Sequence, residues 1–153
     1  MTKEQIFTAW IGEYDKLLRH IIHGFEASSA IQEELFQEIS LNIWRAIPSF
    51  QEKSSVKTFV ARIAHNVLAT HVAKSVKRIK TQSNSLQNDG ESIYEQQQYQ
   101  QLTPFQQLDK IQRQEKLAQT IRQLPLDQRQ VITLSLEGMT YQEIAEILII
   151  STN

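Results

Sequence analysis

The chain has 153 residues and no cysteine, so it holds no disulfide framework and no thiolate metal site, as suits a reducing compartment. This length allows one medium domain or two small ones. No apolar run is long enough to cross a bilayer, and residues 1–11 lack the basic-then-apolar layout of a signal peptide. We therefore expect a cytoplasmic protein without stable membrane insertion.

The formal net charge of −1 hides an uneven distribution along the chain. Residues 53–80 contain seven basic residues and no acidic residue, whereas residues 1–52 contain four basic and eight acidic residues. Residues 81–109 contain four acidic residues and no basic one, and residues 110–153 contain five of each. One short block therefore carries the positive field, which indicates a site for phosphate groups rather than a uniformly basic protein.

Helical spacing of apolar residues predicts three helices in the first half of the chain. Thr2 and Gln5 form a capping box at the start of the first helix, and Ser29 has the same spacing from Gln32 at the start of the second. Pro48 is expected to end the second helix, and Ser54 to cap the third. The inward stripes are Ile6, Trp10, Tyr14, Leu17, Ile21 and Phe25; Ile31, Leu35, Ile39 and Ile43; and Phe59, Ile63, Val67 and Val72.

The periodic pattern stops in the middle of the chain and resumes after it. Residues 81–102 are rich in Gln, Asn and Ser with few aliphatic residues, which predicts a flexible polar linker. Three further helices are expected to start near Thr103, Pro125 and Thr140. The prediction is an all-α fold of two small helical domains, 1–80 and 103–153, joined by that linker.

Basic and hydrogen-bonding residues on the predicted third helix suit nucleic acid. Lys and Arg neutralise phosphates, and Arg, Asn and Thr can hydrogen-bond to base edges. A solvated basic face is the alternative interpretation of the same residues. The candidate DNA-binding residues are Lys53, Lys57, Arg62, Asn66, Thr70, His71, Lys74, Lys77 and Arg78.

The sequence gives little support to an enzyme. The four histidines, at positions 20, 23, 65 and 71, form no His-Glu-x-x-His pair, and no glycine-rich phosphate loop is present. We therefore expect no catalytic residue, no metal ligand and no cofactor.

Several short segments, taken in order, resemble extracytoplasmic-function sigma factors over nearly the whole chain. The matching segments are Glu34-Leu35-Phe36-Gln37-Glu38, residues 50–59, Arg62-Ile63-Ala64 with Asn66, Leu124-Pro125, and Thr140-Tyr141-Gln142-Glu143-Ile144-Ala145. Each segment is weak by itself, but the ordered set is specific. The resemblance implies a promoter-melting domain (σ2), a linker and a helix-turn-helix domain (σ4).

The resemblance also implies the partners and their sites. The chain is expected to bind core RNA polymerase, to recognise the −10 element of promoter DNA and to open the duplex, while the polymerase supplies catalysis. An anti-sigma factor is a further candidate partner. The implied polymerase-binding residues are Glu34, Leu35, Gln37, Glu38 and Leu41.

Three departures from the family pattern leave a second hypothesis open. Thr70 and Ala73 stand where the family usually has Asp and Arg, and Ile149 stands where it often has Gly in the helix-turn-helix turn. The sequence ends at residues 151–153, where the recognition helix is expected to begin, which predicts a partial σ4 that cannot read a −35 element. The apolar residues of the preceding helix are then expected to pack on the first domain, on another protein or on a second copy. The alternative function is a truncated sigma-like interaction module or decoy, which promoter-directed transcription distinguishes from an initiation factor.

Overall fold

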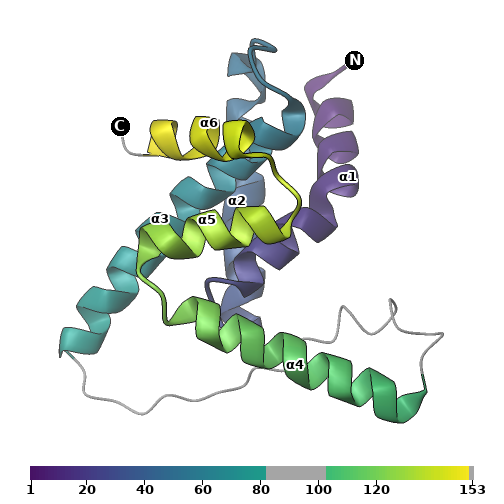
Figure 1. The fold of residues 1–153 in the computed structure, drawn as a ribbon. Coiled ribbons are helices and arrows are strands. Elements are labelled where there is room, and N and C mark those ends of the chain that lie inside the picture. Colours follow the sequence, from purple (N-terminus) through teal and green to yellow (C-terminus); the bar gives the residue numbers. More distant parts are fainter. Residues whose placement is uncertain (82–102, 152–153) are drawn as a thin grey trace.

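The computed structural model describes residues 1–81 and 103–151, and its regular elements are all helices (Figure 1). No strand occurs in these residues, so the predicted all-α fold is confirmed. The predicted linker, residues 81–102, begins one residue too early, because Thr81 is the last residue of α3, and residues 82–102 lie outside the described residues. The elements are α1 (Lys3–His23), α2 (Ser29–Ala46), the 3-10 turn η1 (Ile47–Ser49), α3 (Val56–Thr81), α4 (Pro104–Arg122), α5 (Leu126–Leu136) and α6 (Tyr141–Ser151). We call α1–α3 the first unit and α4–α6 the second unit.

Most helices begin where side-chain capping predicts. The capping boxes at Thr2 and Thr103 are both complete, and Pro125 directly precedes α5. At the start of α6 the hydroxyl of Thr140 accepts a hydrogen bond from the amide of Glu143, whose carboxylate accepts one from the amide of Thr140. Gly138, with a φ of 80°, makes the turn between α5 and α6, where a side chain would be strained.

Two predicted caps are wrong by one residue. Ser28, rather than Ser29, caps α2 by accepting a hydrogen bond from the amide of Ile31. Gln32, the expected partner in a capping box, instead donates to the carbonyl of Glu26 at 2.7 Å. Ser55, rather than Ser54, caps α3 by accepting from the amide of Thr58 at 3.1 Å. Neighbouring serines offer equivalent hydroxyls, so the presence of a capping residue type does not fix which of the two serines caps the helix.

The first unit is built around the contacts of α1, α2 and α3. Leu18 and Ile21 of α1 and Ile39 and Ile43 of α2 are fully buried. Pro48 lies in η1, directly after α2, as the sequence predicts. These buried aliphatic side chains supply most of the stabilisation, because each removes apolar surface from water.

The second unit packs on the first, with α6 crossing α3 (Figure 1). Ile144 and Ile147 of α6 belong to the same buried cluster as the aliphatic residues of the first unit. The face of α3 that is fully buried in this cluster consists of Val60, Ala61, Ala64 and Leu68. The stripe that the sequence predicts to face inward on α3 is only partly buried. The alanines of α3 leave room for another helix to approach closely.

Ile149, which stands where the family often has the Gly of the turn, lies within α6, and this helix continues through Ser151. A β-branched residue is disfavoured at positive φ and is accepted within a helix, which accounts for the continuation. The prediction that the apolar residues of this helix seek a partner is confirmed for Ile144 and Ile147, which pack into the first unit, whereas Ile149 stays exposed. Among the described residues, no helix combines the length and apolar character needed to span a membrane.

We predict that Ile147→Ala lowers the free energy of unfolding by about 3 kcal/mol, because Ile147 is fully buried and its truncation leaves a cavity. Ile149→Ala, in the same helix, is the matched control, because 62% of its surface is exposed. We expect a change within about 0.5 kcal/mol for this control. Urea unfolding followed by circular dichroism measures both. Equal losses for the two variants would contradict the packing of α6 on α3.

Candidate nucleic-acid and polymerase interface

One face of α3 points away from the rest of the molecule and carries three of the candidate DNA-binding residues. Arg62, Asn66 and Thr70 are four residues apart, so they form one stripe along the helix. Ala64 and Leu68 lie two positions on either side of Asn66 and therefore on the opposite, buried side. Asn66 and Thr70 are exposed. The packing of α6 on α3 thus leaves Asn66 and Thr70 accessible, while Arg62 is partly covered.

Arg62 is more buried than its two neighbours in the stripe. Its side chain is half-buried, and its Nε is buried without a hydrogen-bond partner. Burying a guanidinium nitrogen without a hydrogen bond is costly, so this nitrogen favours any arrangement that supplies an acceptor. The hydroxyl of Thr70 donates to the carbonyl of Asn66 at 3.1 Å, which orients the end of the stripe.

The basic residues near α3 are distributed over more than one face. Lys53 in the preceding loop and Lys74 in α3 are both exposed, whereas Lys57 is half-buried. The side chains of Lys77 and Arg78 lie outside the described residues.

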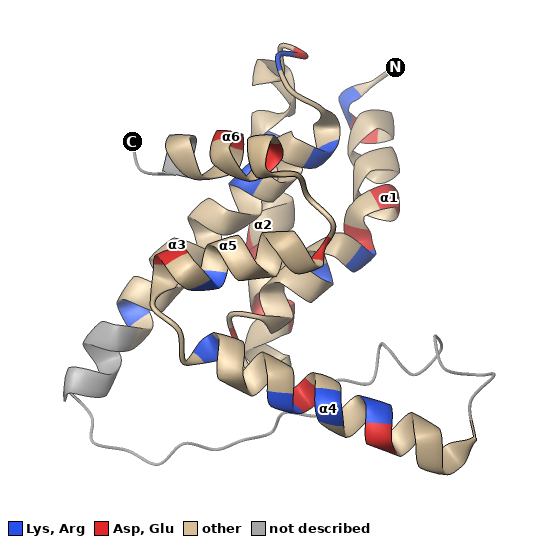
Figure 2. Cartoon of the chain, in the orientation of Figure 1, with Lys and Arg blue, Asp and Glu red and all other residues tan. Residues whose placement is uncertain are grey.

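The backbone hydrogen bond from Thr140, with a smaller effect of the nearby Lys57 cation, lowers the pKa of Glu143 in α6. Figure 2 shows that α4, by contrast, carries both signs of charge along its length.

His71 is also held in an internal contact, away from the outward stripe. Its Nε2 lies 2.9 Å from a carboxylate oxygen of Glu26, in the loop after α1. Burial by itself raises the pKa of Glu26, but the hydrogen bonds from His71 and from the amide of Ser28 outweigh it and lower the pKa. The structure therefore does not bring His71 together with Asn66 and Thr70.

The loop between α2 and α3 is fixed by an aromatic cluster. Phe50 lies with its ring centroid 5.2 Å from that of Trp10 and 4.9 Å from that of Phe59. Such edge and tilted contacts are favourable for aromatic rings, and they anchor the loop at both ends. Within the loop, Glu52 has a φ of 59°, in the left-handed region that non-glycine residues rarely adopt. This exposed, strained residue beside the basic helix has no signal in the sequence.

The candidate polymerase-binding residues on α2 separate into two groups. Glu34, Gln37, Glu38 and Leu41 are exposed, and they lie on the side of α2 that faces away from the core. Leu35 is 3% exposed and belongs to the buried cluster of the first unit. The structure therefore brings four of the five candidates to one surface and assigns Leu35 to the core.

His65 of α3 was not singled out by any sequence pattern. Its side chain is fully buried, both ring nitrogens lack a hydrogen-bond partner, and its ring stands edge-on to that of Phe25 at 5.4 Å. Burial lowers the pKa of His65 to about 3. It is therefore a neutral core residue, and neither of its nitrogens is available to a ligand.

In the part of the chain that the structure describes, no group of three or more His, Cys, Asp or Glu residues is placed to hold a metal ion.

An all-α fold with a basic, hydrogen-bonding helix face suits a DNA-binding protein. Comparison with protein-family models identifies the family: residues 10–78 match Sigma-70 region 2, and residues 114–153 match Sigma-70, region 4. The chain belongs to the sigma-70 family of sigma factors and is of the extracytoplasmic-function type. It is therefore a sigma factor for promoter recognition, in a family of non-enzymatic regulators of transcription. Searches of curated proteins and of solved structures gave no match.

We predict that His65 makes the fold sensitive to acid. The unfolded state takes up a proton at His65 below about pH 6.5, whereas the folded state stays neutral until about pH 3. The contribution of His65 to stability is therefore lost as the pH falls below 6.5, by roughly 3 kcal/mol between pH 7 and pH 4. His65→Leu should remove that part of the pH dependence, as measured by urea unfolding at each pH. An equally steep loss of stability in the variant would contradict the burial of a neutral His65.

Proposed function

We propose that this sigma factor binds core RNA polymerase through the exposed face of α2 and holds the −10 element on the outward stripe of α3. The observation that carries the proposal is the position of Arg62, Asn66 and Thr70 on one face, opposite the buried side of α3. Arg and Asn provide donors and acceptors for base edges, and nearby lysines neutralise phosphates. The match to Sigma-70 region 2 covers both surfaces.

The position of the α2–α3 loop beside α3 also supports a role in opening the promoter duplex. The strained loop at Glu52 and the N-terminal half of α3 lie side by side, fixed by Phe50 and Phe59. Bases that leave the duplex can be held by the polar groups of the stripe, so that binding energy offsets part of the cost of unstacking. Nucleotidyl transfer and its metal ions then belong to the polymerase. This division of roles requires no catalytic residue in the chain.

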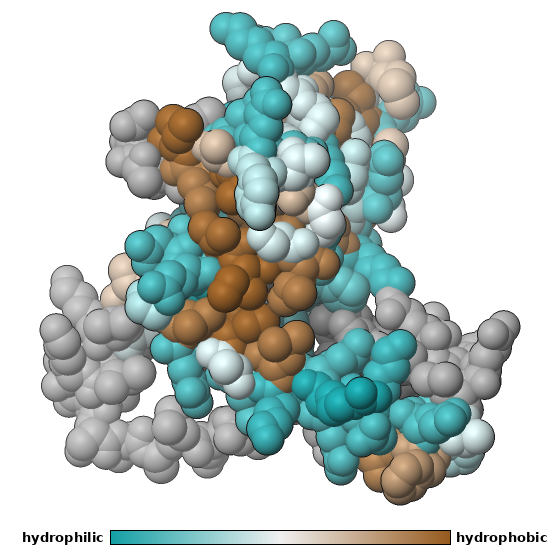
Figure 3. Space-filling model, in the orientation of Figure 1, coloured by the Kyte–Doolittle hydropathy of each residue, from teal (hydrophilic) through white to brown (hydrophobic). Residues whose placement is uncertain are grey.

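A protein partner such as an anti-sigma factor is a second candidate, because α5 exposes apolar side chains. Val131, Ile132 and Leu136 are between 38% and 57% exposed. Figure 3 shows an apolar strip where α5 and α6 reach the surface. Contiguous apolar surface of this kind commonly marks a protein-binding site. The same surface fits the alternative function of a sigma-like decoy.

Transcription by core polymerase from a library of promoter sequences separates the initiation factor from the decoy. We expect RNA whose start sites lie downstream of one shared −10 sequence when the chain is added, and none with core polymerase alone. Polymerase binding without any start site would support the decoy and contradict initiation.

We predict that Gln37→Ala combined with Glu38→Ala weakens binding to core polymerase about tenfold, or about 1.4 kcal/mol, without loss of helicity. Both side chains are exposed on α2. Glu4→Ala, which removes an exposed carboxylate from α1, is the control. Fluorescence titration of labelled chain with core polymerase measures the affinity, and unchanged affinity in the double variant would reject the site on α2.

We predict that Asn66→Ala lowers the preference of the holoenzyme for a matched over a scrambled −10 element by roughly 1–3 kcal/mol. Lys74→Ala should weaken binding to both DNAs equally and reduce the dependence of affinity on salt, since a lysine on a phosphate carries no sequence information. Anisotropy titrations at several salt concentrations measure both effects. Equal losses on both DNAs with Asn66→Ala would contradict base contact by the stripe.

A further inference from the structure

The last turn of α1 and the loop after it lie between the two units and contact both helices α4 and α5. Nδ1 of His20 is 3.1 Å from a carboxylate oxygen of Glu137, at the end of α5. Nε2 of His23 is 3.2 Å from a carboxylate oxygen of Glu115, in α4. Two histidines one turn apart on α1 thus each meet a glutamate from the second unit.

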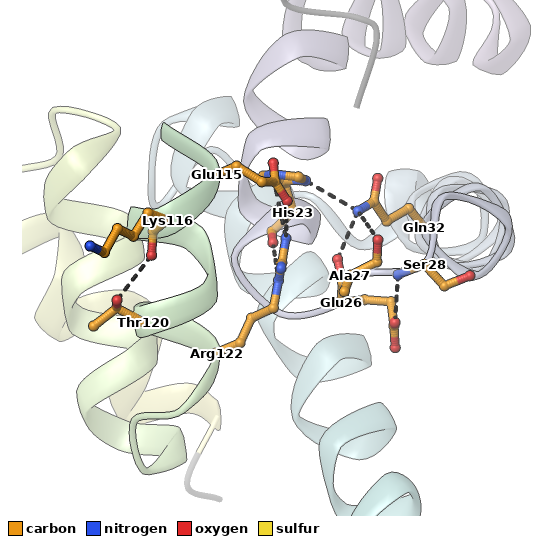
Figure 4. A network of polar contacts seen from close by, with 9 residues as sticks. All are labelled: His23, Glu26, Ala27, Ser28, Gln32, Glu115, Lys116, Thr120 and Arg122. Carbon is orange, nitrogen blue, oxygen red and sulfur yellow. Dashed lines mark hydrogen bonds and ion pairs between the residues drawn. The ribbon is translucent and has the colours of Figure 1, made fainter. Parts of the chain in front are cut away.

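Arg122 adds a contact that uses the backbone of α1 (Figure 4). Its Nε donates to the carbonyl of His23 at 3.0 Å, and its Nη2 lies 3.7 Å from Glu115. The last carbonyls of a helix have no partner within the helix, so a guanidinium from α4 completes the end of α1. The ring of His23 is oriented from its other side by Gln32, whose amide donates to Nδ1 at 3.1 Å.

Close packing accompanies these polar contacts. A Cβ added to Gly24 would lie 3.0 Å from Oγ1 of Thr133, so α5 approaches the backbone after α1 at a point where any side chain is crowded. The guanidinium of Arg129 lies 5.6 Å from the ring centre of Phe25. Burial, followed by the nearby Arg122 cation, lowers the pKa of Arg129. The surface between the end of α1 and helices α4 and α5 is therefore partly dehydrated. Hydrogen bonds there, such as the one from Arg122 to the carbonyl of His23, are stronger than they would be in water.

These contacts are separate from the apolar packing of α6 on α3, so the second unit is held at two places. We propose that residues 20–25 form a latch that keeps the second unit closed on the first, with Glu115, Arg122 and Glu137 as its counterparts. While the latch is closed, Ile144 and Ile147 are buried against the first unit and are not available to another partner. Release of the latch removes one of these two attachments, so the contacts of residues 20–25 raise the fraction of chains in which α6 stays packed on α3. This inference does not depend on the proposed contacts with DNA or polymerase.

Breaking the latch with Glu115→Gln and Glu137→Gln tests the proposal, since both changes remove a charge and keep the side-chain volume. We expect amide hydrogen exchange in α6 to become about tenfold faster, because charge-assisted hydrogen bonds are lost from the closed state only. Asp109→Asn is the matched control: it removes a carboxylate of α4 that pairs with Arg113 of the same helix. Exchange in α6 should not change in the control.

A disulfide provides the reverse test. The chain has no cysteine, and the close approach of Gly24 to Thr133 suits a bridge in a Gly24→Cys, Thr133→Cys variant. In the Glu115→Gln, Glu137→Gln background, the oxidised bridge should restore the original exchange rate of α6, and its reduction should abolish the rescue. Unchanged exchange in the charge-removed variant overturns the latch. Equal acceleration in α2 also overturns it, because the contacts would then hold the whole fold and not the closed arrangement.

Discussion

The burial of one face of α3 is the interaction on which the rest of the structure depends. Val60, Ala61, Ala64 and Leu68 form that face, and none of them retains any exposed surface. Helices α1 and α2 contact α3 from the first unit, and α6 contacts it from the second. Asn66 and Thr70 lie on the opposite side of α3 and are exposed, so the same packing that stabilises the fold presents them outward.

The division of α3 into faces links stability to function. Residues of the buried face can be changed only at a cost in folding, whereas the outward stripe contributes little to the core and is free to suit a ligand. His65 lies on the buried side: it is a polar residue forced to stay neutral by its surroundings. The carboxylate of Glu143 in α6 also interacts electrostatically with the cation of Lys57 in α3. The contact between α6 and α3 therefore has a charged component beside the apolar one. The two units are thus coupled through the helix that is proposed to meet DNA.

Local signals in the sequence predicted the helices and most of their caps. The capping boxes at Thr2 and Thr103 depend on residues three positions apart, so they can be recognised without tertiary information. The basic block between residues 53 and 80 likewise follows from composition alone. The polymerase-binding role of α2 was inferred from its resemblance to a known helix and stays a prediction; four of the five implied residues are exposed.

Long-range packing explains what the sequence did not reveal. The buried face of α3 contains two alanines, which carry a weak apolar signal, and its burial depends on α6, far away in the chain. The burial of Leu35, the pairing of His71 with Glu26 and the latch around His23 depend on the same three-dimensional proximity. None of these contacts has a fixed spacing in the sequence.

The most direct test of the outward stripe is cross-linking within the open promoter complex. Because the chain has no cysteine, a photoreactive group can be placed at Asn66→Cys or Thr70→Cys, with exposed Gln112→Cys in α4 as the control. We expect positions 66 and 70 to cross-link to bases of the −10 element, and position 112 not to do so. Absence of −10 cross-links from both stripe positions in an active complex would contradict the placement of promoter DNA on this face of α3.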